Sequence, residues 1–289
     1  MDFKCSGDNL EQIPEEVVTE TGITFPEAHT NKNNMATLAV ALMKHRGDVI
    51  SRVPFCVTVE AEAMGAQIKL GDALNGPRVE SYPYSSIEEM SSLQKMDITK
   101  GRIKEVLDAV QIIAAAGEKV SLSVEGPFTI ISSLIDPMNF YKGLRKNPQQ
   151  IRDILAIVEA GIISYSLEGI KRGASIISYG DPVGAMDIVG PKVYREFSGT
   201  SSQGIIKGIK EAGGKVLIHL CGKTSTALEK IERASSYAID ARVDLTYGQA
   251  MIDLIDKITE PLALGHRCIK WSSKKMGQPV LWGIELKEA

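Results

Sequence analysis

Residues 216–222 read VLIHLCG, an apolar run that carries a histidine and a cysteine two positions apart. The run has the length and composition of a buried strand. Two glycines at residues 213–214 favour the end of a helix, and the polar residues 223–226, KTST, favour the start of another. The stretch therefore predicts a helix–strand–helix unit with His219 and Cys221 at the carboxyl end of the strand.

Strand and helix patterns alternate along the rest of the chain. Strands joined by helices form a parallel sheet with helices on its faces. About seven strand signals in 289 residues favour an α/β fold of the (β/α)8 TIM barrel type over a doubly wound sheet. The strand signals lie at residues 49–59, 120–125, 174–179, 216–221, 237–240, 261–265 and 280–282, and the main helix signals at 101–116, 148–171, 191–212 and 250–258.

We expect residues 1–289 to form a single barrel domain, in which residues 1–47 are a helical N-terminal cap. Residues 69–99 are rich in Gly, Pro, Ser and Tyr. A loop of that length is more often functional than a simple connection, so this segment is a predicted substrate-facing lid.

Composition excludes several classes of protein. Hydrophobic residues make up 44% and charged residues 24% of the chain, and the net charge of -3 gives no reason to expect nucleic acid or a membrane surface as partner. The N-terminal residues lack the basic and apolar regions of a signal peptide, so we expect a cytoplasmic protein. Four cysteines are too few for a disulfide scaffold. Assembly of the chain into a homo-oligomer is compatible with this composition.

Acidic residues follow several of the predicted strands, where a barrel places its chemistry. Glu125, Asp181 and Asp240 are the catalytic candidates. Each has a structural alternative: a buried hydrogen bond for Glu125, a turn before Pro182 for Asp181, and an ion pair with Arg242 for Asp240. Glu60 or Glu62, and His266 with Cys268, are further polar residues at expected strand ends.

His219 and Cys221 form the candidate metal pair. Residues two apart in a strand point the same way, and mixed nitrogen and sulfur ligands suit zinc. The structural alternative is a core cysteine beside a histidine that is bonded to backbone. Cys268 is the candidate for a third ligand, with a buried filler as the alternative.

Several motifs in order along the chain together resemble a known family. They are FPEAH (25–29), RVPFCVTVEAEAMG (52–65), EGPFT (125–129), GDP (180–182), GPK (190–192), IHLCG (218–222) and IDARVD (239–244). This set is similar to the methylcobamide:coenzyme M methyltransferase branch of the uroporphyrinogen decarboxylase superfamily, over about residues 20 to 250.

The resemblance implies a (β/α)8 barrel that binds one zinc ion through an H-x-C pair, matched here by His219 and Cys221, and a later cysteine. It also implies a thiol substrate similar to coenzyme M, and a methylcobamide (corrinoid) carried by a partner protein. Zinc would deprotonate the thiol, and the thiolate would attack the methyl group, giving a methyl thioether and Co(I).

The sequence departs from the family after about residue 255. The family's later cysteine lies in a Gly-Cys segment, which this chain lacks, so Cys268 is the predicted substitute and we expect an incomplete barrel. Three functions follow: zinc-dependent methyl transfer from a corrinoid protein to a thiol, uroporphyrinogen decarboxylation, and a non-catalytic barrel that docks a corrinoid protein. Decarboxylation is disfavoured, because the chain lacks an Arg-rich N-terminal signature that would bind the substrate carboxylates.

Overall fold

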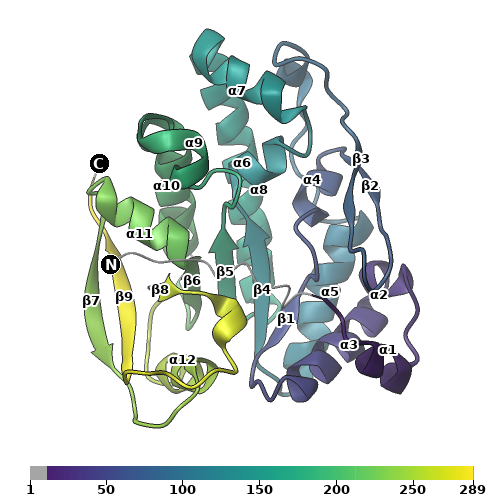
Figure 1. Ribbon diagram of the computed structural model, residues 1–289, viewed down its shortest axis with the longest axis vertical. Coiled ribbons are helices and arrows are strands. Elements are labelled where there is room, and N and C mark those ends of the chain that lie inside the picture. The colour runs from purple at the N-terminus through teal and green to yellow at the C-terminus, as the bar shows by residue number, and fades with distance from the viewer. Residues whose placement is uncertain (1–11, 212, 289) are drawn as a thin grey trace.

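A seven-stranded sheet lies at the centre of the computed structural model, which describes residues 12–211 and 213–288. The order of strands across the sheet is β1-β4-β5-β6-β8-β9-β7 (Figure 1). The strands are β1 (Ser51–Val53), β4 (Val120–Glu125), β5 (Ile176–Gly180), β6 (Leu217–Cys221), β7 (Ala234–Asp240), β8 (Leu262–Arg267) and β9 (Val280–Leu286). Each of the seven strand signals in the sequence corresponds to one of these strands.

Helices precede, separate and flank the strands. They are α1 (Glu15–Thr21), α2 (Glu27–Thr30), α3 (Lys32–His45), α4 (Val59–Ala63), α5 (Gly101–Ala115), α6 (Pro127–Ile131), α7 (Pro137–Lys146), α8 (Pro148–Lys171), α9 (Met186–Val193), α10 (Gly199–Lys210), α11 (Gly222–Lys230) and α12 (Tyr247–Ile255). Short 3-10 or π segments are η1 (Glu89–Ser92), η2 (Tyr194–Ser198) and η3 (Ile269–Trp271).

The two faces of the sheet bury different sets of apolar residues. Ile218 and Leu220 of β6 point to the face that packs against α8 and α10 and belong to the larger core cluster. Leu217 points to the opposite face, where a second cluster includes Tyr247 and Met251 of α12. Because residues two apart in a strand share a face, His219 lies on the same face as Leu217.

The parallel part of the sheet confirms the predicted α/β class. Strands β1, β4, β5, β6 and β8 pair in parallel, whereas β9 is antiparallel to both β8 and β7. In a regular barrel successive strands are neighbours, so β7 would pair with β6. Here β8 takes that place because its central residues are buried, while Tyr237 and Asp240 of β7 are exposed, as suits an edge strand.

Two local predictions from the sequence differ from the structure. The predicted strand 49–59 is reduced to Ser51–Val53, because Pro54 has no N–H for a sheet hydrogen bond, and α4 follows. The predicted loop 69–99 includes the strand β3 (Arg78–Ser81), which pairs antiparallel with β2 (Gln67–Lys69) at the start of the loop. Whether this segment acts as a lid stays a prediction.

Three helices precede the first strand. Helix α3 packs against β1 and α5, and α1 and α2 pack against α3. Residues 1–11 of the predicted cap lie outside the described residues. The single-domain organisation and the capping role of residues 1–47 stay predictions.

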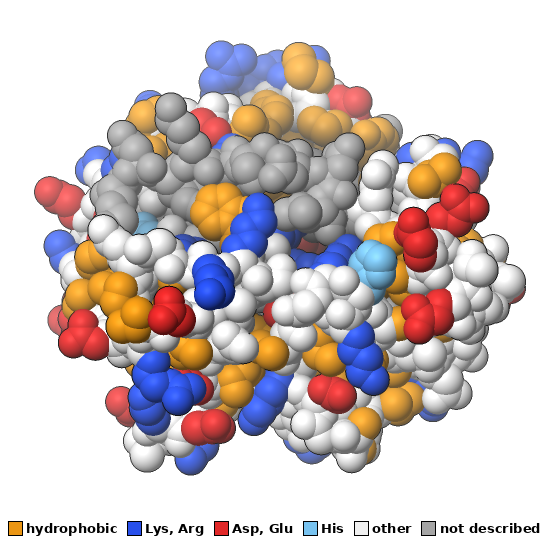
Figure 2. Space-filling view, turned by 60° about the horizontal axis from the view of Figure 1, so that its bottom comes forward, with side chains coloured by type: hydrophobic (Ala, Val, Ile, Leu, Met, Phe, Trp, Pro, Cys, Tyr) orange, Lys and Arg blue, Asp and Glu red, His pale blue; other side chains and the backbone are white. Residues whose placement is uncertain are grey.

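The surface carries charges of both signs. Figure 2 shows acidic and basic side chains interspersed over one face of the molecule. Within residues 12–211 and 213–288, every helix is too short or too polar to cross a membrane.

Candidate functional site

The carboxyl ends of the parallel strands meet in one row. Glu125 pairs with Gly180 across β4 and β5, and Cys221 pairs with Arg267 across β6 and β8. A Cβ atom added to Gly180 would lie 3.4 Å from the Cβ atom of Cys221, so these two residues are also neighbours. The sheet therefore places Glu125 and Cys221 at the same end, where the carboxyl termini of the parallel strands lie, as the sequence predicts.

His219 is buried with both ring nitrogens unpaired. Its side chain is 1% exposed, and neither Nδ1 nor Nε2 has a hydrogen-bond partner among the described residues. Burial lowers the pKa of His219 from 6.5 to about 4, because the charged imidazolium is poorly solvated there. The imidazole is therefore neutral near pH 7, which is the form that binds a metal ion.

Cys221 lies where β6 ends and α11 begins. It is half-buried and forms no disulfide. The two-residue spacing puts its side chain on the same face of β6 as His219. The unpaired nitrogens and this thiol have the donor chemistry of a zinc pair.

Cys268 is linked to His219 through Tyr247, which is a neighbour of both residues. It precedes η3. Burial raises the pKa of the Tyr247 phenol, and the neighbouring Cys268 thiol raises it further. Tyr247 in turn meets the His219 ring edge to face, with centroids 5.8 Å apart. No group of three or more His, Cys, Asp or Glu side chains in the described chain is arranged to hold a metal ion. The zinc pair of His219 and Cys221, and Cys268 as its third ligand, therefore stay predictions.

A bulge in β8 turns His266 away from the mouth of the sheet. His219 pairs with Leu264 and Cys221 with Arg267, so β8 has one residue more than β6 in this interval. His266 adopts a left-handed φ of 59°, and its Nε2 lies 3.2 Å from Oε2 of Glu229 on α11. The expectation that His266 faces the same mouth as Cys221 is therefore wrong, and Arg267 occupies that position.

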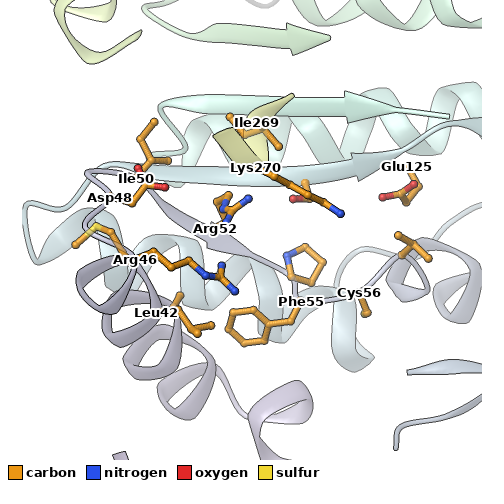
Figure 3. A pocket seen from close by; sticks show the side chains of 15 residues that line it. Leu42, Arg46, Asp48, Ile50, Arg52, Phe55, Cys56, Glu125, Ile269 and Lys270 are labelled. Atoms are coloured by element: carbon orange, nitrogen blue, oxygen red, sulfur yellow. The ribbon is translucent and has the colours of Figure 1, made fainter. Parts of the chain in front are cut away.

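A cavity lies beside β1 and the end of β4. Figure 3 shows Arg52, Lys270 and Glu125 projecting into it. Of the six predicted site residues, only Glu125 lines this cavity. Its wall is formed by Ala39, Leu42, Met43, Arg46, Asp48, Ile50, Arg52, Pro54, Phe55, Cys56, Val57, Ser123, Glu125, Ile269 and Lys270.

Glu125 is held by a second carboxylate. Its backbone N–H donates to Oε1 of Glu60 at 2.9 Å. Glu60 is 1% exposed, and burial raises its pKa to about 7. The sequence places Glu60 and Glu62 near a strand end, but both lie on α4. Glu60 therefore holds the backbone of Glu125 in place without lining the cavity itself.

Asp181 is occupied by hydrogen bonds at the start of α6. Its carboxylate accepts from the backbone N–H groups of Phe128 (3.1 Å), Thr129 (2.9 Å) and Gly184 (3.2 Å), and from the Thr129 hydroxyl at 2.8 Å. This pattern agrees with the structural alternative, in which Asp181 stabilises a turn. A catalytic role for Asp181 stays a prediction.

Asp240 is exposed at the end of the edge strand β7. Four strands, β5, β6, β8 and β9, separate β7 from β4 in the sheet. The structural alternative, an ion pair between Asp240 and Arg242, is not formed; the Nε of Arg242 donates to Asp253 at 2.7 Å instead. The sheet therefore does not bring Asp240 next to Glu125, and its catalytic role also stays a prediction.

One buried network beside the cavity has no clear signal in the sequence. The Arg102 guanidinium, whose side chain is 3% exposed, pairs through Nε with Glu62 and donates to the Thr58 hydroxyl at 2.8 Å and to Cys56 Sγ at 3.1 Å. Its partners lie on or beside α4, between 40 and 46 residues earlier in the chain. Helical periodicity places Arg102 at the start of α5 but does not reveal these contacts.

Comparison with known proteins gives a consistent set of matches. The family model described as "Uroporphyrinogen decarboxylase (URO-D)" matches residues 10–259. A methylcobamide:CoM methyltransferase, MtaA, from Methanosarcina barkeri (strain Fusaro) is 31% identical over 77% of this chain and 68% of its own length. A methylcobamide:CoM methyltransferase, MtbA, from Methanosarcina acetivorans is 27% identical over 80% of this chain and 69% of its own length.

A solved structure of a methyltransferase from Methanosarcina mazei has a TM-score of 0.67 and 28% sequence identity to this chain. The match covers 75% of this chain, which spans 65% of the solved chain. Together with the family match, this similarity confirms the predicted TIM barrel class.

Proposed function

Because the chain belongs to the uroporphyrinogen decarboxylase family, we propose that it transfers a methyl group from a methylated corrinoid protein to a thiol similar to coenzyme M. The relatives named as methylcobamide:CoM methyltransferases support this reaction. The observation that carries the proposal is the buried, neutral His219 on the same strand face as Cys221, with both imidazole nitrogens unpaired in the described structure.

In this proposal His219 and Cys221 hold a zinc ion, and Cys268 is the candidate third ligand. Zinc supplies the positive charge that lowers the pKa of the acceptor thiol. His219 keeps its lone pair available at neutral pH because burial disfavours its protonation. Cys221, the last residue of β6, would hold the zinc ion and its bound acceptor at the carboxyl end of that strand.

Glu125 takes part in the same proposal as the residue that receives the thiol proton. It lies at the same end of the sheet as Cys221, where the parallel strands have their carboxyl ends, and it lines the cavity. The thiolate sulfur then forms a bond to the methyl carbon, and the electron pair of the cobalt–carbon bond stays on the corrinoid as Co(I). The Glu60 carboxylate holds the backbone of Glu125 during this step.

The decisive experiment is metal analysis of the purified protein with methyl transfer from methylcobalamin to coenzyme M as the activity assay. We expect close to one zinc ion per chain and loss of that ion in Cys221→Ala. Cys56→Ser is the matched control, because Cys56 lines the cavity but is not a predicted ligand. A folded wild-type protein without zinc would contradict the proposal.

A second candidate is a barrel that docks a corrinoid protein without catalysis. The absence of a three-residue metal group in the described part of the chain favours it. Capture of a cobalamin-containing partner by a protein that transfers no methyl group to coenzyme M would support this candidate over the first.

A further inference from the structure

Tyr247 has a buried hydroxyl that lacks a hydrogen-bond partner among the described residues. Its side chain is 1% exposed at the start of α12, and the hydroxyl has no hydrogen bond within residues 12–211 and 213–288. A buried unpaired hydroxyl costs free energy that a phenylalanine would avoid. A tyrosine at this position is therefore explained if a ligand completes its hydrogen bonding.

The position of Tyr247 links it to the candidate zinc pair. Its ring meets the His219 ring edge to face, with centroids 5.8 Å apart. The guanidinium of Arg267, which pairs in register with Cys221, lies 5.3 Å from the centroid of the same ring. Tyr247 therefore contacts both His219 and the residue opposite Cys221.

Three unpaired polar atoms are thus gathered on one face of the sheet: the two ring nitrogens of His219 and the hydroxyl of Tyr247. Tyr247 belongs to an apolar cluster that includes Ile176, Leu217 and Leu264, and Arg267 and Cys268 are among its other neighbours. A buried polar cluster in such surroundings needs a bound group to satisfy it.

We propose that the Tyr247 hydroxyl donates a hydrogen bond to the sulfur of the thiol acceptor bound beside His219. The inference rests on the proposed function and adds a residue that positions the acceptor. A phenol hydroxyl is a suitable donor, and hydrogen bonds to a charged acceptor are stronger than those between neutral groups. Tyr247 would then hold the sulfur in place without binding the metal.

The test is calorimetric titration of zinc-loaded protein with coenzyme M, in the wild type and in Tyr247→Phe. The ring and its contacts with His219 remain in this variant, and only the hydroxyl is lost. We expect the Kd for coenzyme M to rise about tenfold. The zinc content of the variant should equal that of the wild type. Its melting temperature should be equal to or higher than that of the wild type.

Tyr165→Phe is the matched control. Tyr165 is also fully buried with an unpaired hydroxyl, but it belongs to α8 and to the core cluster on the opposite face. This control should leave the Kd for coenzyme M within twofold of the wild-type value.

The possible outcomes separate this inference from the proposed function. A wild type that binds zinc and coenzyme M, with an unchanged Kd in Tyr247→Phe, overturns only the role of Tyr247. A drop of several degrees in the melting temperature of metal-free Tyr247→Phe also overturns it, since the hydroxyl would then have a partner within the fold. A wild type that binds neither zinc nor coenzyme M refutes the proposed function together with this inference.

Discussion

The buried imidazole of His219 makes folding stability depend on pH in a way that one substitution should remove. In His219→Phe a ring still packs against Tyr247, but no group titrates at this position. We expect the difference in free energy of unfolding between the wild type and His219→Phe to change with pH in metal-free protein.

The direction follows from the lowered pKa. The folded state holds His219 with a pKa of about 4, compared with an ordinary value of 6.5, so the unfolded chain binds the proton more tightly. The corresponding stability is fully present above pH 6.5 and is lost as the pH falls from 6.5 to about 4. Since one pKa unit corresponds to about 1.4 kcal/mol, the loss is about 3 kcal/mol.

The assay is urea unfolding of both proteins in the presence of a chelator at several pH values from 8 to 4, followed by circular dichroism. The difference between the two proteins isolates His219, because His29 has a similarly lowered pKa and contributes equally to both curves. A difference between wild type and His219→Phe that is constant from pH 8 to pH 4 would refute the reasoning.

Two further predictions concern the buried network behind the cavity. Burial raises the pKa of Glu60 from 4.5 to about 7, so the folded state holds this proton more tightly than the unfolded chain does. The corresponding stability is present in full below pH 4.5 and is lost as the pH rises to about 7, so Glu60→Gln should gain about 3 kcal/mol of stability at pH 8 relative to its effect at pH 4. Equal effects of Glu60→Gln at both pH values in urea unfolding would contradict this. Arg102→Lys should lower the free energy of unfolding by about 2 kcal/mol, because an ammonium group cannot reproduce the separate guanidinium hydrogen bonds to Glu62 and Thr58. Lys100→Arg at an exposed neighbouring position is its control, and equal stability of both variants would count against the network.

Local patterns were sufficient for the parallel part of the fold. The segments 120–125 and 216–221 are mostly buried on both faces and are short, as is typical of strands in a parallel sheet. The helix 148–171 has the same bounds in the sequence prediction and in the structure. The edge strand β7 was detectable as a strand, but its place in the sheet was not. Its position depends on competition with β8 for a fully buried site.

The candidate site shows the same division. The spacing of His219 and Cys221 by itself puts both side chains on one face of a strand, because the strand repeat is two residues. The bulge in β8, by contrast, adds one residue and exchanges His266 for Arg267 at the mouth. A one-residue change in register reverses which side chains face the site, and an isolated sequence carries no marker of it here.

The sequence by itself therefore determined the α/β class, the strands and the His219–Cys221 pair, all of which depend on residues close together in the chain. Only the tertiary structure decided that Tyr247 lies against His219, that Glu60 holds Glu125, and that Arg102 joins α5 to α4. These contacts join residues between 28 and 65 positions apart in the sequence. The polar contacts among them form because a buried polar group is stabilised by a hydrogen-bond partner that the fold brings close to it. Local periodicity does not encode which residue that partner is.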